Sequence, residues 1–157
     1  MGLILDHLPF RSSVALHADE NNILQAAADV LKFYKVKVSR TQLIAELKSH
    51  PHYPSLLCLG DVLKQYNIDS LSLQVAPDDL VKIEEPFVSF LSLKEELLFV
   101  KPDRQGNVTY QPRGKPVVHE SLNEFAKKYV GVLLLPEPMI DEAGQQIHTR
   151  QGERGKT

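Results

Sequence analysis

The residues that could do nucleophilic chemistry lie together in one stretch, Ser49 to Leu63, which reads SHPHYPSLLCLGDVL. It holds Cys58, the only cysteine of the 157-residue chain, and two of the six histidines, His50 and His52. A cysteine nucleophile needs a base within hydrogen-bond reach and usually a helix N-terminus that stabilises the thiolate. The stretch therefore poses two alternatives, a catalytic Cys–His pair or a plain helix start with a buried cysteine.

The neighbours of Cys58 favour the second alternative. Leu56 and Leu57 precede it and Leu59 follows it, so nearly every residue around it on a helical turn is apolar. Apolar surroundings raise the pKa of a thiol and make it inert, and free cysteine is among the most buried residue types. We therefore predict a structural role for Cys58, while a cysteine hydrolase that uses Cys58 with His50 or His52 stays open as the alternative.

A metal site and other common catalytic patterns find less support. His50 and His52 stand two residues apart and could share one ion, yet no further ligand is adjacent to them. The sequence contains no Cys-x-x-Cys, no His-Glu-x-x-His, no glycine-rich phosphate loop and no Gly-x-Ser-x-Gly. We therefore expect no metal and no cofactor.

The composition is that of a globular domain, with 43% hydrophobic and 24% charged residues. The net charge is −2, and lysines and arginines form no continuous stripe, so we expect no nucleic-acid partner. A single cysteine cannot form an internal disulfide, and no leader or run of about 18 apolar residues is present. These features predict a cytoplasmic location and no insertion of this chain into a membrane.

The elements that must position these residues begin with helices. We predict an irregular arm over residues 1–18 and a first helix from Asp19, where apolar residues recur at helical spacing. A second helix follows Ser39, which starts a Ser-x-x-Gln capping-box pattern. A third has Pro54 in its first position and ends at Asn67, a residue suited to a left-handed cap.

After Asn67 the apolar spacing changes from helical to alternating, which is typical of strands. A short helix from about Glu120 to Tyr129 interrupts the strands. The predicted strands cover residues 70–75, 86–93, 97–101, a segment from 107, a short segment before Glu120, and 131–135. Helices followed by a mostly antiparallel sheet define an α+β fold. We place one domain at 19–138 and a flexible tail or linker at 139–157, where apolar residues are scarce.

Several phrases of the chain resemble the double-glycine leader peptidases, the bacteriocin-processing cysteine peptidase domains of peptide-exporting ABC transporters. They are FYKVKVSRTQL, HPHYPSLLCLGDVLKQYNID, PFVSFLS and GNVTYQPRGKPVVHESLNEFAKKYVGVLLL. The resemblance covers roughly residues 19 to 136 and implies a papain-like fold. It is closest to the degenerate version that precedes the membrane part of some bacterial vitamin K epoxide reductase-like proteins, in which HP-x-YPSLL recurs.

The resemblance also implies that the catalytic residues are missing. Active members have a Gln and then an Asp-Cys pair at the first helix, a His at the start of a central strand, and an Asp-Pro after the next strand. The corresponding positions here are Asn22, Leu98 and Gln111, and no histidine lies between His52 and His119.

We therefore expect a catalytically inactive peptidase-like domain that binds a peptide or a partner protein, including a membrane protein in cis or in trans at the inner face of the membrane. The loop residues His50, His52, Tyr53 and Pro54 are the candidates for lining a peptide groove. An active cysteine peptidase and a purely structural assembly domain are the alternatives.

Overall fold

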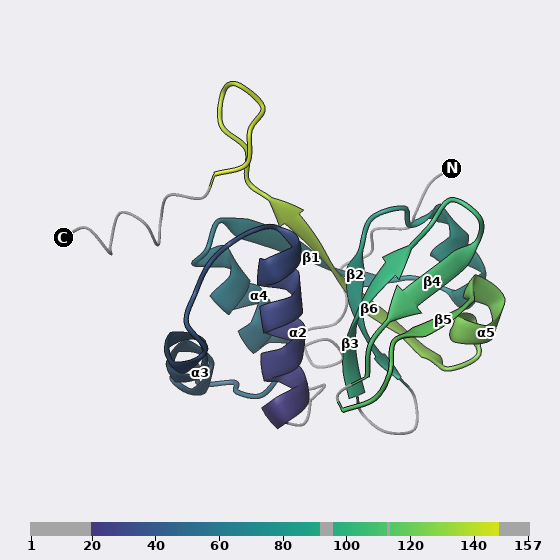
Figure 1. Cartoon of the computed structure of the whole chain (residues 1–157), viewed down its shortest axis with the longest axis horizontal. Helices are drawn as coiled ribbons and strands as arrows, with labels where there is room; N and C mark the ends of the chain where they lie inside the picture. The colour runs from purple at the N-terminus through teal and green to yellow at the C-terminus, as the bar shows by residue number, and fades with distance from the viewer. Residues whose placement is uncertain (1–19, 92–95, 113, 148–157) are drawn as a thin grey trace.

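The structure is a computed structural model that describes residues 20–91, 96–112 and 114–147. The predicted arm at 1–18 lies outside these residues. Within the described residues, three helices precede the sheet: α2 (Glu20–Phe33), α3 (Arg40–Lys48) and α4 (Leu56–Lys64). Figure 1 shows them gathered on one side of the molecule, with most of the sheet on the other.

The first helix packs and the second helix starts as their sequences predict, while the predicted start at Asp19 lies outside the described residues. One face of α2 is fully buried, since Ile23, Ala27 and Val30 each have 0% exposure. The Ser39 hydroxyl caps α3 by accepting a hydrogen bond from the Gln42 N–H at 3.1 Å. The predicted cap at Ser39 is therefore confirmed.

The start of α4 differs from the prediction that Pro54 is its first residue. Ser55 is the N-cap, and its buried hydroxyl accepts a hydrogen bond from the Cys58 N–H at 3.2 Å, so the helix begins at Leu56. Pro54 lies outside the helix because the serine hydroxyl accepts a hydrogen bond from a free N–H group of the first turn. The proline side chain has no acceptor for such a hydrogen bond. The helix ends at Lys64, before the predicted end at Asn67, and only the left-handed conformation predicted for Asn67 is confirmed, with a φ of 65°.

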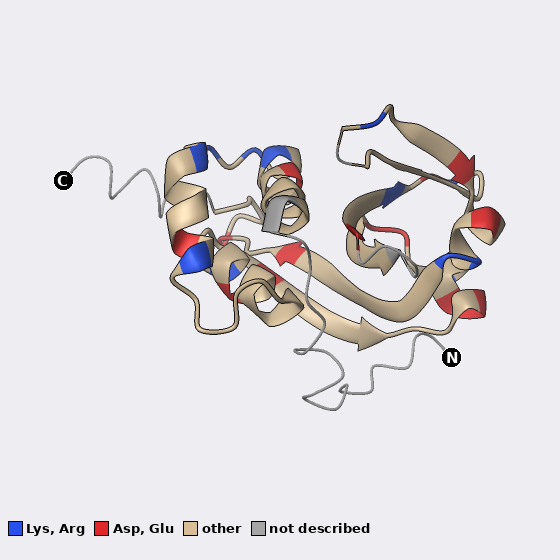
Figure 2. Ribbon diagram, turned by 90° about the horizontal axis from the view of Figure 1, so that it is seen from below, with Lys and Arg blue, Asp and Glu red and all other residues tan. Residues whose placement is uncertain are grey.

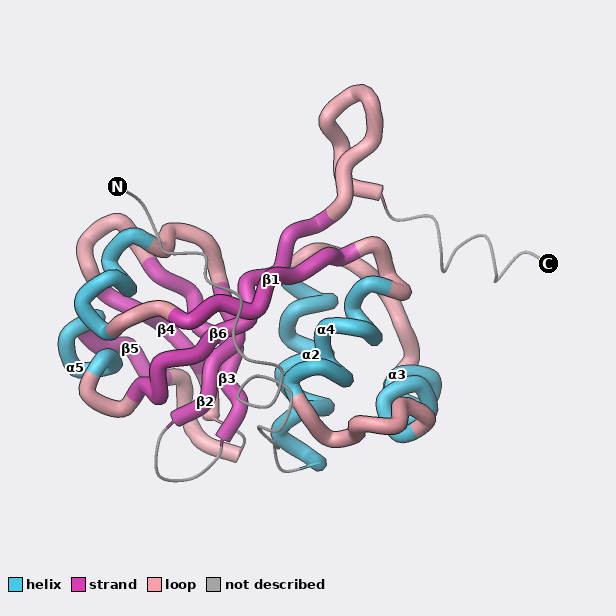
Figure 3. Tube along the Cα trace, turned by 180° about the vertical axis from the view of Figure 1, so that it is seen from behind, coloured by secondary structure: helices cyan, strands magenta, loops and turns pink. Residues whose placement is uncertain are grey.

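A six-stranded antiparallel sheet follows, with the order β1-β6-β2-β3-β4-β5. Its strands are β1 (Ile68–Gln74), β2 (Phe87–Leu91), β3 (Glu96–Pro102), β4 (Asn107–Tyr110), β5 (Val118–Ser121) and β6 (Tyr129–Pro138), with the short 3-10 helix η1 (Pro77–Lys82) between β1 and β2. The predicted α+β class, with N-terminal helices on a mostly antiparallel sheet, is confirmed. In the view from behind in Figure 3, β1 and β6 run side by side from the sheet toward the helices.

Two hydrophobic cores lie on opposite faces of this sheet. Alternate residues of β3 divide between them: Leu97 and Phe99 join the helices, while Leu98 and Val100 join the other core. The second core is built around Phe125, which has 0% exposure. Its ring packs against the rings of Phe87, Tyr110 and Tyr129 at centroid distances of 6.0, 5.7 and 6.3 Å.

The helix predicted from about Glu120 to Tyr129 is shorter than expected. α5 spans only Leu122–Ala126, because Glu120 pairs with Val108 in the sheet and Tyr129 is already part of β6. Cross-strand pairing at both ends therefore replaces the outer turns of the predicted helix.

The chain continues past β6 into a short hairpin over residues 139–147. Ile140 and Gln146 form a bridge, and the Ile147 N–H donates to the Met139 carbonyl at 2.9 Å. The Gln146 side-chain amide also donates to the Tyr34 carbonyl at 2.6 Å. These residues belong to the predicted tail, whose bounds stay a prediction. None of the helices in the described part of the chain is long and apolar enough to cross a membrane.

Candidate functional site

Cys58 lies inside the helical half, where it has 0% exposure. Its thiol donates to the Leu47 carbonyl of α3 at 3.5 Å. Burial raises the pKa of this thiol from 9.0 to about 12, and the nearby Asp61 carboxylate adds to the rise. The thiolate that a cysteine peptidase requires is therefore disfavoured at this position.

His50 is held in a geometry that uses both ring nitrogens. Nδ1 accepts the backbone N–H of His52 at 3.0 Å, and Nε2 lies 2.7 Å from the Asp61 carboxylate. A neutral ring that accepts a hydrogen bond at Nδ1 carries its proton at Nε2, and this N–H donates a hydrogen bond to Asp61. In this arrangement His50 has no free lone pair with which to take a proton from a nucleophile.

The remaining loop residues divide between solvent and core. His52 is exposed, while Tyr53 is partly buried and packs against the core of the helical half. Pro54 follows a cis peptide bond. None of the four loop candidates lines the cavities described below, and their role in a peptide groove stays a prediction.

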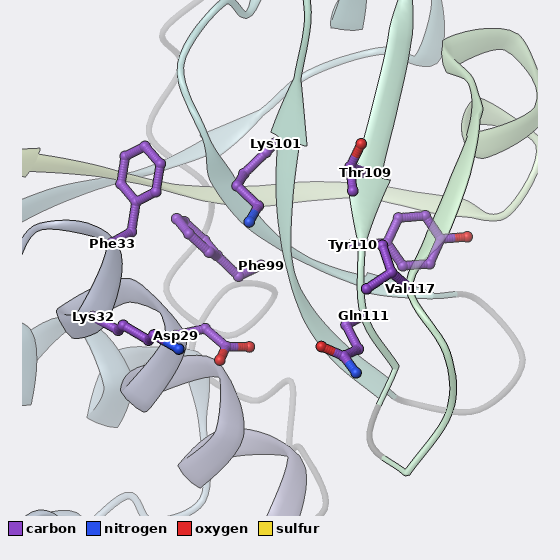
Figure 4. A pocket seen from close by; sticks show the side chains of 9 residues that line it. All are labelled: Asp29, Lys32, Phe33, Phe99, Lys101, Thr109, Tyr110, Gln111 and Val117. Atoms are coloured by element: carbon purple, nitrogen blue, oxygen red, sulfur yellow. The ribbon is translucent and has the colours of Figure 1, made fainter.

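A cleft lies between the two halves, with a volume of about 340 Å³ (Figure 4). We call it the inter-half cleft. Residues from α2, β3, β4 and the connection after β4 line it: Asp29, Lys32, Phe33, Phe99, Lys101, Thr109, Tyr110, Gln111 and Val117. Its lining therefore combines aromatic rings with charged and amide groups from both halves of the fold.

The cleft holds two packed aromatic rings beside charged groups. Phe33 is 44% exposed and packs edge-on against Phe99, with ring centroids 5.6 Å apart. Burial raises the pKa of Asp29, against the opposing effects of the hydrogen bond from Gln25 and the charge of Lys101. The result is an apolar wall beside a mixed polar lining, which suits a ligand with both apolar and hydrogen-bonding groups.

The three positions expected, from the resemblance, to correspond to the family's catalytic residues are placed differently. Gln111 lines the inter-half cleft, and Asn22 lies half-buried in the first turn of α2. Leu98 points into the core on the far face of the sheet, while Leu97 and Phe99 on either side of it face the helices. A strand alternates its side chains, so the position that faces the cleft is one residue away from Leu98.

The cleft residues other than Gln111 were not singled out by their sequence. Asp29, Lys32 and Phe33 follow at helical spacing, and Phe99 and Lys101 at strand spacing, so each set shares a face of its own element. This spacing predicts that each set shares one face of its element. It does not predict that the two faces lie opposite each other. Among the described residues, no cysteine or histidine lines the cleft and no group of three or more His, Cys, Asp or Glu side chains could hold a metal ion.

Comparison with known proteins gives matches in structure and in a family model. The model of the Peptidase C39 family matches residues 12–140. A comparison with curated proteins gives no match.

Three solved structures share the fold. A double glycine motif protease from an AMS/PCAT transporter, solved in complex with the leader peptide, has a TM-score of 0.65 and 16% identity, over 88% of this chain and 91% of that one. The peptidase domain of Streptococcus ComA, a bifunctional ABC transporter of a quorum-sensing pathway, has a TM-score of 0.57 and 15% identity, over 88% of this chain and all of that one, 100%. The N-terminal peptidase C39-like domain of the toxin secretion ATP-binding protein from Vibrio parahaemolyticus has a TM-score of 0.56 and 12% identity, over 74% and 95%.

The family model spans most of the chain, and the helices and antiparallel sheet have the papain-like arrangement of these peptidase domains. The chain belongs to the Peptidase C39 family.

Proposed function

We propose that this domain is a C39 member that binds a peptide in the inter-half cleft without hydrolysing it. The observation that supports the proposal most is the place of the cysteine. Cys58 is the only cysteine of the sequence, and it lies buried against α3 and does not line the cleft.

Hydrolysis by a cysteine peptidase depends on a thiolate and a base that touch the bound peptide. Loss of the nucleophile alone costs several orders of magnitude in rate in triad peptidases. The resemblance assigns the catalytic positions to Asn22, Leu98 and Gln111, and the neighbours of Leu98 that face the helices are Leu97 and Phe99. These residue types cannot supply a thiolate, an imidazole base or an orienting carboxylate.

Peptide binding is supported by the lining of the cleft. Phe33 and Phe99 offer an apolar wall, while Gln111 and Thr109 offer groups that can pair with a peptide main chain. A structural neighbour was solved with a leader peptide bound, so the same fold can present a peptide site. We extend the proposal to a partner that contains a double-glycine leader.

The family relation also supports a cellular location for the proposed peptide binding. The solved neighbours include peptidase domains of ABC transporters. We propose that the domain acts in the cytoplasm at the inner face of a membrane, beside a membrane protein in cis or in trans. The resemblance of its HPHYPSLL phrase to the version that precedes vitamin K epoxide reductase-like proteins makes a membrane redox protein a second candidate partner.

The test exposes the purified domain to a pool of synthetic peptides with double-glycine leaders and identifies captured and cleaved species by mass spectrometry. We expect capture without cleavage, and weaker capture by Lys101→Glu, which reverses a charge in the cleft. Lys64→Glu is the matched control, since Lys64 is exposed and lines none of the cavities described.

Two results would contradict the proposal. Cleavage that Cys58→Ser abolishes would establish an active peptidase. Absence of both capture and cleavage would favour an assembly domain whose cleft has no peptide ligand.

A further inference from the structure

A second cavity lies within the helical half, between α2, α3 and their connection, with a volume of about 640 Å³. We call it the α2–α3 groove. Its apolar lining consists of Leu24, Ala28, Leu31, Val36, Val38 and Leu43. The volume falls in the range of protein ligand sites, and the lining is more apolar than that of the inter-half cleft.

Four cations surround this apolar lining: Lys32, Lys35, Lys37 and Arg40. All four are exposed, and they fall within nine consecutive residues of a chain whose net charge is −2. Across the described part of the chain, the salt bridges involve other residues, and no acidic residue lines the groove. Figure 2 shows several Lys and Arg positions close together on the helical half.

The backbone explains how apolar and charged side chains come to alternate here. Lys35 has a φ of 62°, and its N–H donates to the Lys32 carbonyl at 3.0 Å, which ends α2 with a left-handed residue. Val36, Lys37 and Val38 follow and all line the groove; Val36 is buried and Val38 half-buried, while Lys37 between them is exposed. Arg40 then opens α3.

We infer that the α2–α3 groove docks an acidic amphipathic segment of a partner protein. Its apolar side chains would enter the groove between Leu31, Val38 and Leu43, and its carboxylates would meet the cations at the rim. Charge complementarity of this kind steers encounter and fixes register, while apolar burial supplies most of the affinity.

The shape of the site favours a protein segment over other anionic partners. A concave apolar surface receives individual side chains, whereas an anionic membrane is contacted by a convex or flat face with its cations spread beside it. Nucleic acid would use the cations and leave the apolar floor without a partner. The site is also distinct from the inter-half cleft, since only Lys32 lines both.

The test uses two synthetic peptides with the same Leu and Phe ridge, one with Glu and one with Gln at the flanking positions. Binding to the whole domain is measured by calorimetry at low and high salt. We expect the Glu peptide to bind more tightly than the Gln peptide, with a difference that shrinks at high salt. The double variant Lys37→Glu/Arg40→Glu should weaken the binding of the Glu peptide by about tenfold, so that the Gln peptide binds more tightly than the Glu peptide.

The control is Lys64→Glu/Arg104→Glu, which makes the same change in charge at exposed residues outside the groove. Folding of the groove variant is not at risk from Arg40→Glu, because an acidic residue in the first turn of α3 is favoured by the helix dipole. Val38→Asp, which places a carboxylate in the groove, should weaken the binding of both peptides. Circular dichroism checks that this variant folds.

Equal binding of the two peptides, or equal loss in the groove and control variants, would overturn the inference. Binding to phosphatidylglycerol vesicles with no binding to either peptide would assign the groove to a membrane surface instead. Each outcome is independent of the peptide test on the inter-half cleft, so the two proposals can fail separately.

Discussion

The burial of Cys58 predicts that alkylation of the folded protein is very slow. A rise in the pKa of the thiol from 9.0 to about 12 lowers the thiolate population by about a thousandfold. At about pH 8 an ordinary thiol is about one-tenth ionised, whereas this thiol is ionised in about one molecule in ten thousand. Because Cys58 has 0% exposure, reagent access adds a second barrier to reaction.

The assay follows the intact mass of the protein during incubation with iodoacetamide, in native buffer and in concentrated urea. We expect the folded chain to react at least about a thousandfold more slowly than the unfolded chain, since both the thiolate population and access are restored by unfolding. The Cys58→Ser protein gives the background. A folded-state rate within about tenfold of the unfolded rate would refute a buried, protonated thiol and return Cys58 to the list of candidate nucleophiles.

Three further predictions concern stability, each measured by urea unfolding. The contribution of Cys58 to the free energy of unfolding should be constant below pH 9.0 and fall as the pH rises toward 12, by about 1.4 kcal/mol per pH unit, because the folded state holds the Cys58 proton more tightly than the unfolded state; Cys58→Ala should lose this part of the fall. Ser55→Ala should cost about 1 kcal/mol, since it removes the acceptor for the Cys58 N–H, and more than the matched loss of the exposed cap in Ser39→Ala. Phe125→Ala should cost about 3 to 5 kcal/mol, because the ring is fully buried among three others, and a loss below about 1 kcal/mol would contradict the packing of the second core.

Much of the fold could be predicted from local patterns. The cap at Ser39, the left-handed residue Asn67 and the change from helical to alternating spacing are all observed. One error is local, since α4 begins after the Ser55 cap and not at Pro54, and others fall where residues elsewhere in the chain decide the outcome. Glu120 and Tyr129 have sequences compatible with a helix, yet strand partners that are far away along the chain draw them into the sheet.

The candidate site was harder to predict than the fold. The sequence draws attention to Cys58 and His50. In the structure the Cys58 thiol is hydrogen-bonded to the Leu47 carbonyl, and the His50 ring to the Asp61 carboxylate. The cleft is instead lined by residues such as Phe33 and Lys101 that carry no catalytic signature. Their significance comes from the approach of α2 to β3, and spacing within one element cannot report a distance between two elements.

The division of alternate strand residues between two cores has a mechanical consequence for the inter-half cleft. Leu133 and Leu134 of β6 are adjacent, yet one packs with the second core and the other with the helices. The same strand therefore belongs to both halves that flank the cleft. Rotation of one half against the other would disturb both cores, so we expect the cleft to keep its width when a ligand binds. In hydrogen exchange the amides of β2, β3 and β6 should behave as one cooperative unit that opens only with global unfolding.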